Sequence, residues 1–343
     1  MKMKKYGLIG EKLGHSFSPY LHSRLGEYDY RLYELREEEI PGFLKSEDIA
    51  GVNVTIPYKQ TVLKYCNELS DKVKKIGSAN TLVKKDDGTL YADNTDYDGF
   101  EYILDKTDAD VRGKKILVLG SGGASKAVCS VLRDKKAEVV IISRRGENNY
   151  GNLTKHRDAY AVVNTTPVGM YPNVDASPVD LTVFPCLRYV LDLIYNPYKT
   201  KLLIQAEEMG LVYINGSDML VEQARVAAEI FSGHAIDPEV VRDISSDMTR
   251  NALDVTLIGM PGCGKTTIGR LLAEKLGRRF IDIDEEIVRL TDFDDLTSTL
   301  PLMPQTVGKL SNIQNIRRII RDVLIRHGFY DTVNYTLVNA KYI

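Results

Sequence analysis

A lysine and an aspartate stand behind two separate apolar runs of the sequence, and together they could pass a proton to and from a substrate. Lys59 follows the run 53–56, and Asp96 ends the polar run 93–96. Because ligands bind at the carboxyl ends of strands in open α/β sheets, a lysine placed there can serve as a general acid–base, with an aspartate to orient its ammonium group. Taken singly, Lys59 would be an ordinary surface lysine and Asp96 a turn or helix-cap residue.

A glycine-rich turn between an apolar run and a helical pattern indicates a dinucleotide site. Its residues are Gly120, Ser121, Gly122, Gly123, Ala124, Ser125 and Lys126. Glycine permits a tight turn and a close approach of the backbone to a pyrophosphate, and the helix N-terminus adds free N–H groups and partial positive charge. The third small position of the motif holds serine in place of glycine or alanine, and serine is still small enough for the helix to pack on the strand.

The residues after the next predicted strand favour NADP over NAD. Ser143, Arg144 and Arg145 stand where enzymes that use NAD place an acid to accept the ribose hydroxyls. A guanidinium group instead matches the 2′-phosphate of NADP. Without the dinucleotide turn before them, two adjacent arginines would more often form a solvated basic turn.

A second loop fits the pattern G-x-x-x-x-G-K-[ST]. The residues expected to contact phosphate are Gly259, Gly262, Gly264, Lys265 and Thr266. Backbone N–H groups of such a loop cradle phosphates, its lysine reaches the terminal ones, and its threonine holds Mg²⁺. The sequence therefore predicts a site for ATP with Mg²⁺ at this loop.

Alternating apolar and amphipathic segments place these loops in an α/β fold with a parallel sheet and right-handed crossovers. Strands are predicted at residues 6–10, 52–56, 81–84, 89–92, 115–119, 138–143, 161–164, 189–193, 211–214 and 254–260. Helices are predicted at residues 19–25, 37–45, 59–65, 99–105, 199–209 and 216–231, from the first glycine-rich turn to residue 135, and from the second to residue 276. A turn at 86–88 joins two strands, and residues 237–254 are interpreted as a charged connector.

Composition limits the class of protein and its partners. A chain of 343 residues, 43% hydrophobic and 27% charged, is typical of a soluble globular protein with two or three domains. A net charge of -2 and the lack of an apolar run of membrane-span length argue against nucleic acid and membrane partners. Cysteines and histidines are scattered, so we predict no metal site and expect free thiols in a reducing cytoplasm.

Eight runs, in order, resemble the shikimate dehydrogenase family over about residues 5–235. They are GHSFSP at 14–19, NVTIPYK at 53–59, GSANT at 77–81, DNTD at 93–96, the turn at 120–126, NTTPVGM at 164–170, DLIYNP at 192–197 and NGSDMLVEQA at 215–224. The resemblance implies a two-domain fold. An α/β substrate domain at 1–105, completed by 217–245, would accompany a Rossmann NADP domain at 106–216.

The resemblance also implies an activity, the reversible reduction of 3-dehydroshikimate to shikimate with hydride from NADPH. In that reaction Lys59 would be the acid–base group and Asp96 its partner. The residues implied to bind the substrate are Ser16, Ser18, Thr55, Asn80, Asp96, Tyr195 and Gln223. Those implied to line the cofactor are Asp71, Gly120, Ser121, Gly122, Gly123, Ala124, Ser143, Arg144, Arg145, Leu193 and Gly216.

The rest of the chain resembles parts of two other families. Residues 251–290 are similar to the start of shikimate kinase and form an incomplete P-loop α/β segment. Because the arginines of that family have no match, we do not expect kinase activity. Residues 291–343 resemble a fragment of a phenylalanyl-tRNA synthetase β chain, with a predicted helix at 313–324 and a strand at 333–337. One hypothesis is that a two-enzyme fusion is joined to an unrelated reading frame near Leu290.

Three alternatives stay open on the sequence. The first is a quinate/shikimate dehydrogenase that uses NAD, against which Arg144 and Arg145 argue. The second is a bifunctional dehydrogenase–kinase, which would need the missing arginines. The third is a catalytically silent binding protein, which the intact Lys59 and Asp96 disfavour. The oligomeric state is not fixed by the sequence, and a homodimer is one candidate.

Overall fold

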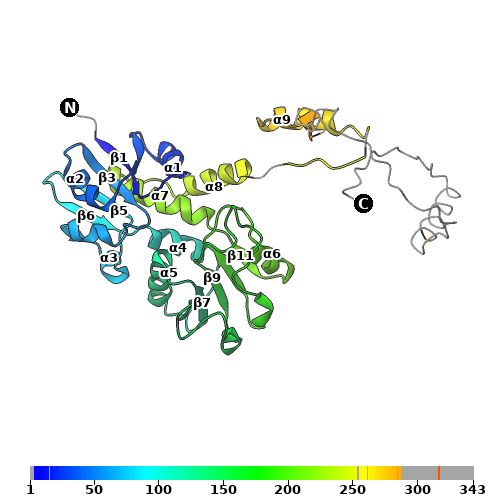
Figure 1. Ribbon diagram of the computed structural model, residues 1–343, viewed down its shortest axis with the longest axis horizontal. Coiled ribbons are helices and arrows are strands. Elements are labelled where there is room, and N and C mark those ends of the chain that lie inside the picture. The colour runs from blue at the N-terminus through cyan, green and yellow to red at the C-terminus, as the bar shows by residue number, and fades with distance from the viewer. Residues whose placement is uncertain are drawn as a thin grey trace, which may run out of the picture. The chain divides into compact units, whose positions relative to one another are not determined.

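The computed structural model of the 343-residue chain describes residues 4–14, 16–252, 255–260, 262–283, 285–286 and 316. The chain divides into two compact units, residues 1–256 and 257–343. All strands of the described residues lie in the first unit (Figure 1). In the synthetase-like tail only Ile316 is described, and it is helical. The rest of the predicted helix at 313–324 and the strand at 333–337 lie outside the described residues.

Six strands form a mixed sheet at the start of the first unit. They are β1 (Lys5–Gly10), β2 (Tyr30–Glu34), β3 (Ile49–Val54), β4 (Glu68–Leu69), β5 (Thr81–Lys84) and β6 (Leu90–Asp93), in the spatial order β2-β1-β3-β5-β6-β4. β1 is parallel to β2 and β3, whereas β5 is antiparallel to β3 and β6. The prediction of a parallel sheet is wrong here because the predicted turn before β6 closes a hairpin. In that turn Gly88 has a φ of +85°, which glycine adopts without strain.

Short helices cover this mixed sheet. They are α1 (Ser18–Leu25), α2 (Ile40–Lys45), α3 (Asp71–Ile76) and α4 (Asp96–Asp105), with 3₁₀ turns at Glu37–Glu39 and Thr61–Tyr65. Ile40 and Leu44 of α2 are buried in one core with Val52 of β3. The helix predicted at 59–65 is wrong in type, since this stretch forms only the shorter 3₁₀ turn.

Five parallel strands form the second sheet, as predicted from the apolar runs. They are β7 (Lys115–Leu119), β8 (Glu138–Ile142), β9 (Ala161–Asn164), β10 (Tyr189–Asp192) and β11 (Val212–Ile214), in the order β11-β10-β9-β7-β8. The helices α5 (Gly123–Asp134) and α6 (Lys201–Glu208) follow β7 and β10, with 3₁₀ turns at Leu153–His156 and Leu181–Val183. Central strands are buried on both faces, as parallel sheets require.

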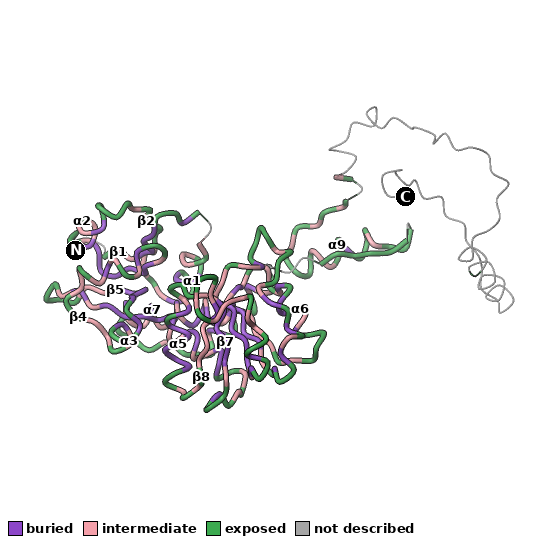
Figure 2. Tube along the Cα trace, turned by 60° about the horizontal axis from the view of Figure 1, so that its bottom comes forward, coloured by how far each residue is buried: buried purple, intermediate pink, exposed green. Residues whose placement is uncertain are grey.

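Two helices connect the sheets. Phe100 and Ile103 of α4 are buried in one core with Val118 of β7. The long helix α7 (Ser217–Ser232) follows the second sheet, yet it packs against β3, β5, α1 and α4 of the first (Figure 2). A Cβ on Gly99 of α4 would come within 2.7 Å of the Met219 carbonyl oxygen, so glycine is what allows the two helices to lie this close.

The segment interpreted as a charged connector is instead a helix, α8 (Glu239–Ala252). Its Val241, Ile244 and Met248 recur at helical spacing and are buried against α1 and α7. The sequence interpretation failed because the many charged residues of this stretch lie on the opposite face and mask the apolar one.

The second unit has one complete described helix, α9 (Lys265–Leu276). Residues 255–260, inside the strand predicted at 254–260, form no strand, and Ile258 is 92% exposed. A strand needs a paired neighbour to satisfy its backbone groups, and this short segment offers none among its described residues.

Candidate functional site

Lys59 and Asp96 meet at the edge of the mixed sheet where β3 ends. Lys59 lies in the loop between β3 and the 3₁₀ turn, and Asp96 is the first residue of α4. The Nζ atom of Lys59 donates to Oδ2 of Asp96 at 2.6 Å, and the two side chains are 19% and 12% exposed. The pair is therefore largely shielded, yet a small molecule can still reach it.

Asn80 holds the other oxygen of Asp96. Its Nδ2 atom donates to Oδ1 of Asp96 at 3.0 Å and to the Thr95 hydroxyl at 3.1 Å, and its Oδ1 accepts from the Thr95 backbone N–H at 2.7 Å. Asn80 is itself 3% exposed. With Lys59 on one oxygen and Asn80 on the other, the Asp96 carboxylate is fixed in orientation.

The two serines predicted to bind a carboxylate lie together where α1 begins, Ser16 before the helix and Ser18 as its first residue. The Ser16 hydroxyl donates to Oγ of Ser18 at 3.1 Å. Between them, the ring of Phe17 meets that of Tyr195 edge-on at a centroid distance of 5.7 Å. Tyr195 follows β10 of the second sheet, so this contact brings predicted substrate residues of both sheets together.

Thr55 lies at the end of β3, and Gln223 lies on α7. Thr55 directly follows β3 and donates its backbone N–H to the Ile9 carbonyl at 3.0 Å. Gln223 lies on α7 beside Gly99 of α4, and its amide donates to the Leu220 carbonyl at 2.8 Å. The second amide N–H and the Oε1 atom of Gln223 remain as its further donor and acceptor groups.

The dinucleotide turn has the shape that its sequence predicts. Gly120 has a φ of +102°, and a Cβ there would meet the side chains of Thr165 and Thr166 at 2.9 and 3.0 Å. A Cβ on Gly122 or Gly123 would meet no atom within 4 Å, so the space above these two glycines is open. Buried Ser125 donates from its hydroxyl to the Gly120 carbonyl at 2.8 Å, a bond that glycine or alanine could not make. These features fit a pyrophosphate at the N-terminus of α5.

Some of the remaining predicted cofactor residues lie in contact with one another, and others do not. Arg144 and Arg145 are exposed in the turn after β8, which Ser143 begins. Leu193 and Gly216 lie in contact, since a Cβ on Gly216 would overlap the Leu193 carbonyl. Asp71 starts α3 and forms an exposed ion pair with Lys74 at 3.0 Å, so no contact among the described residues brings it to the other predicted cofactor residues.

A buried acid that the sequence analysis did not single out joins the end of β9 to the loop between β10 and α6. Asp192, at the end of β10, is 0% exposed. Its Oδ1 accepts from the Asn164 amide at 2.9 Å and from the Ile194 backbone at 3.1 Å, and its Oδ2 accepts from the Thr200 hydroxyl at 2.7 Å. Burial raises the pKa of Asp192 to about 6, although these three bonds act to lower it.

Other polar residues near the site were also missed. Tyr30 of β2 donates from its phenol to Oδ1 of Asn53 at 2.7 Å, and His22 stacks on Tyr30 at a centroid distance of 3.9 Å. Burial lowers the pKa of His22 to about 3, so His22 is neutral at physiological pH. Asn53 belongs to a run that resembles the family, so its place near the site could have been predicted. Tyr30 could not, because the sequence of β2 shows no strand pattern.

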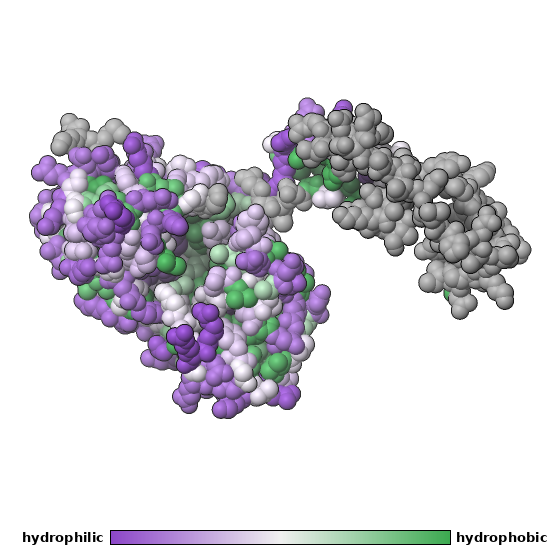
Figure 3. All heavy atoms as spheres, viewed as in Figure 1, coloured by the Kyte–Doolittle hydropathy of each residue, from purple (hydrophilic) through white to green (hydrophobic). Residues whose placement is uncertain are grey.

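Large apolar side chains are exposed on the loops after β3 and β9. Ile56, beside Thr55, is 76% exposed, and Tyr171, after β9, is 66% exposed. Elsewhere, the face of the first unit seen in Figure 3 is mostly hydrophilic, with hydrophobic residues in smaller areas. Exposed apolar residues around polar catalytic groups are typical of a ligand site.

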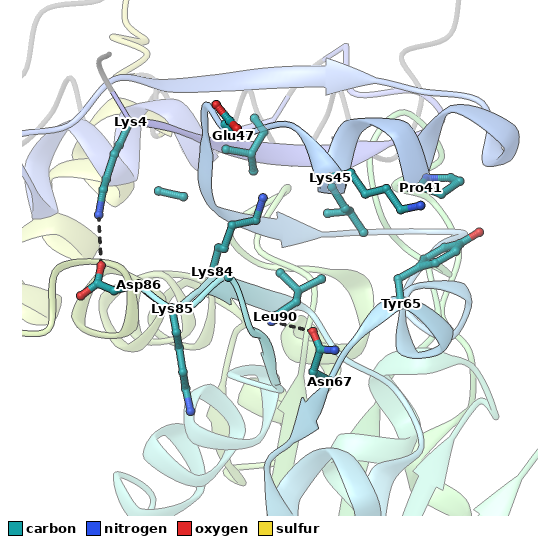
Figure 4. Close-up of a pocket in the computed structure, with 14 residues that line it drawn as sticks. Lys4, Pro41, Lys45, Glu47, Tyr65, Asn67, Lys84, Lys85, Asp86 and Leu90 are labelled. Carbon is teal, nitrogen blue, oxygen red and sulfur yellow. Dashed lines mark hydrogen bonds and ion pairs between the residues drawn. The ribbon is translucent and has the colours of Figure 1, made fainter. Parts of the chain in front are cut away.

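A cavity of ≈ 700 Å³ lies elsewhere, between α2, the start of β3 and the β5–β6 hairpin. Figure 4 shows Lys45, Lys84 and Tyr65 around it. None of the predicted site residues lines this cavity. Lys84 donates to the Ser46 carbonyl and Lys85 donates to Glu68. These are ordinary surface contacts and do not indicate a ligand site in the cavity.

The second phosphate loop keeps the expected local geometry. Gly262 and Gly264 have φ angles of +78° and +84°. Lys265 donates from Nζ to the carbonyls of Gly259 and Met260 at 2.8 and 2.9 Å. In a separate contact, the Thr266 hydroxyl lies 3.1 Å from Oδ2 of Asp282. No group of three or more His, Cys, Asp or Glu side chains suited to a metal ion occurs among the described residues.

Family models match three successive parts of the chain, in the order predicted. The shikimate dehydrogenase substrate binding domain matches residues 8–82, shikimate kinase matches 261–294, and the phenylalanyl tRNA synthetase beta chain CLM domain matches 296–343. In the part of the chain that the structure describes, no helix is long and apolar enough to span a membrane.

Whole proteins match the first unit. A shikimate dehydrogenase (NADP(+)) of Clostridium perfringens is 37% identical over 268 residues, which are 72% of this chain and 98% of the relative. The solved chorismate mutase/shikimate 5-dehydrogenase fusion protein from Clostridium acetobutylicum is similar with a TM-score of 0.69 at 36% identity, over 74% of this chain and 99% of that one. Shikimate 5-dehydrogenase from Thermus thermophilus, in complex with NADP(H) and shikimate, gives a TM-score of 0.65 at 31% identity, over 73% and 100%.

Proposed function

The chain belongs to the shikimate dehydrogenase family, whose relatives are NADP-dependent oxidoreductases, and we propose that Lys59 and Asp96 form its proton-transfer pair. The reaction is the reversible NADPH-dependent reduction of 3-dehydroshikimate to shikimate. The observation that carries the proposal is the 2.6 Å contact between Lys59 and Asp96, two partly shielded side chains at the edge of the mixed sheet.

The pair handles one proton in each direction. As an ammonium, Lys59 donates a proton to the oxygen of the ketone while that carbon receives hydride, and the product is an alcohol. In the reverse direction neutral Lys59 takes the hydroxyl proton as hydride leaves the carbon. Asp96 orients Lys59 throughout, and Asn80 keeps Asp96 from turning. When bound, NADPH supplies the hydride.

Short polar side chains hold the rest of the substrate in this proposal. Ser16 and Ser18 would donate hydroxyls to the carboxylate, and Tyr195 would close over it with Phe17. The complex of the Thermus thermophilus relative with NADP(H) and shikimate supports a site of this kind. Thr55, Asn80 and Gln223 would bind ring hydroxyls or the carboxylate.

The open turn at 120–124 would hold the pyrophosphate, and Arg144 and Arg145 would pair with the 2′-phosphate. Leu193 and Gly216 would line the cofactor, and Asp71 would lie near its nicotinamide end. The substrate domain would comprise 1–105 with 217–245, and the NADP domain 106–216. Four free cysteines support a reducing, cytoplasmic setting.

The substitution Lys59→Ala tests the proposed pair. Because general acid–base help is worth about 10²- to 10⁴-fold, kcat for shikimate oxidation should fall by that factor while KM changes little. NADPH formation is followed by absorbance, with Lys64→Ala as a control, because Lys64 is a nearby lysine that pairs with exposed Glu37. An unchanged kcat in Lys59→Ala would remove this lysine from the chemistry.

Substrate and cofactor choice are tested in the same assay. We expect rapid turnover with shikimate and NADP and poor turnover with NAD. The double substitution Arg144→Ala with Arg145→Ala should raise KM for NADP at least 10-fold without changing that for NAD, since only NADP carries the 2′-phosphate. Equal use of quinate would instead identify a quinate/shikimate dehydrogenase.

A second candidate function is ATP binding at the loop 259–266, without phosphoryl transfer. Two observations favour it. Gly262 and Gly264 have the left-handed backbone conformation. Lys265 donates to a backbone carbonyl of its own loop, and a bound phosphate would take the place of that carbonyl as the acceptor. Equilibrium binding of a fluorescent ATP analogue with Mg²⁺ tests it. Binding should vanish in Lys265→Ala and persist in the control Lys275→Ala, and no binding to the unsubstituted chain would exclude the site.

A further inference from the structure

The carboxylate of Asp192 is buried, ionisable and unused by the proposed chemistry. It lies at the carboxyl end of β10, between the end of β9 and the loop that joins β10 to α6. Burying such a group costs free energy unless its oxygens are hydrogen-bonded. The three donors around it are Asn164 at the end of β9 and, from the two ends of the loop between β10 and α6, Ile194 and Thr200, so the carboxylate fixes the end of β9 and this loop relative to one another.

The end of β9 is linked to the dinucleotide turn. Asn164, held by Asp192, accepts on its own Oδ1 from the backbone N–H and the hydroxyl of Thr166 at 3.0 and 2.7 Å. The side chains of Thr165 and Thr166 form the surface against which Gly120 packs. Displacement of Asn164 would therefore displace the floor of the turn at 120–124.

The loop between β10 and α6 is held at both ends. Asp192 holds the Ile194 backbone N–H, and the Ile194 carbonyl accepts from the Gly216 N–H at 3.0 Å. Leu193 lies against Gly216 with no room for a side chain there. The same loop ends at Thr200, the N-cap of α6, whose hydroxyl donates to the other carboxylate oxygen.

We propose that Asp192 is a positioning residue for the cofactor, which sets the loops after β9 and β10 against the dinucleotide turn. The inference rests on the proposed function for the identity of the cofactor, NADP. It predicts that Asp192 acts on the affinity for NADP and leaves the serines and the Lys59–Asp96 pair of the other sheet unchanged.

The arrangement of donors offers a conservative and a disruptive substitution. In Asp192→Asn the amide oxygen can keep both N–H donors on Oδ1, and the new amide N–H can donate to the Thr200 oxygen, so all the loops stay linked. In Asp192→Ala three buried donors lose their acceptor together. If Asp192 acts by positioning these loops, Asp192→Ala should weaken NADP binding strongly and Asp192→Asn should preserve it.

The experiment measures the dissociation constant of NADP by calorimetry and the KM values for NADP and shikimate, all with the full chain. We expect Asp192→Ala to weaken NADP binding at least 10-fold. KM for shikimate should rise less, because Tyr195 is the one residue of the held loop that is proposed to contact the substrate. NADP binding of Asp192→Asn should stay within threefold of the unsubstituted chain. Asp180→Ala is the matched control. Asp180 also holds a turn of the second sheet, through Thr182 and Gln205, but it makes no contact with the loops at 164–166 or 193–194.

Unchanged NADP binding in Asp192→Ala would overturn the inference, and so would an equal rise in the two KM values. If Asp192→Ala does not fold, Thr166→Val decides, because it keeps a methyl group against Gly120 and removes the hydroxyl held by Asn164. A three- to tenfold loss of NADP affinity is expected there, and no loss would contradict the inference. Because NADP binding is measured directly, failure of shikimate turnover alone would refute the proposed function and not this one.

Discussion

At the scale of single residues, the buried carboxyl of Asp192 makes stability depend on pH. Its pKa is raised from 3.8 to about 6 in the folded protein, so between these values the unfolded chain loses the proton first. Stability from this group is therefore full below pH 4 and falls as pH rises to 6, by about 3 kcal/mol in all. Asp192→Asn should abolish that fall. Urea unfolding of both proteins from pH 4 to 7 checks it, and parallel curves would contradict it.

Single residues could be predicted where they belong to a run that resembles the family. They were harder to predict where their contacts join segments that are distant in the sequence. Lys59, Asn80 and Asp96 were predicted, and the structure brings them together. The contact between Phe17 and Tyr195 was not predictable, because it joins loops of two sheets whose relative placement no local pattern encodes. Asp192 belongs to the run at 192–197 that resembles the family, but its burial could not be predicted, since a sequence does not reveal which acids lose contact with water.

At the scale of elements, the close approach of α4 and α7 positions Asp96 and Gln223. Gly99→Ala would place a methyl group 2.7 Å from the Met219 backbone oxygen, so the helices must separate. We expect a loss of about 1–3 kcal/mol in unfolding free energy and a lower kcat/KM. Gly42→Ala in α2 is the control, since its methyl group would meet nothing within 4 Å and should be neutral or stabilising. Equal stability of the two variants would refute the packing argument.

Some helices and strands were predicted correctly and others were missed, for reasons of burial. Parallel strands of the second sheet are buried on both faces and show as continuous apolar runs, so 115–119 and 161–164 were predicted correctly. The edge strand β2 is mostly exposed or half-buried and has no such run. Helix α8 was missed because its apolar face becomes evident only against α1 and α7, a tertiary partner that the sequence does not show.

At the scale of the whole molecule, the first unit carries every predicted dehydrogenase residue. The chain covers 98% of a Clostridium perfringens shikimate dehydrogenase with 72% of its own length. The kinase and synthetase likenesses at 261–294 and 296–343 follow one another directly and hold none of the residues predicted for the dehydrogenase site. The dehydrogenase activity should therefore be independent of the second unit.

Removing residues after 256 tests that independence. Because α8 completes the apolar core with α1 and α7, a chain of residues 1–256 keeps all four cores of the first unit. Its kcat and KM for shikimate and NADP should stay within twofold of the full chain, with a Tm changed little. A chain cut at residue 236 is the contrast, since it lacks α8 and exposes Leu21 and Val221, and it should unfold at a lower temperature. Loss of activity in the 1–256 chain would show instead that the second unit supports the first.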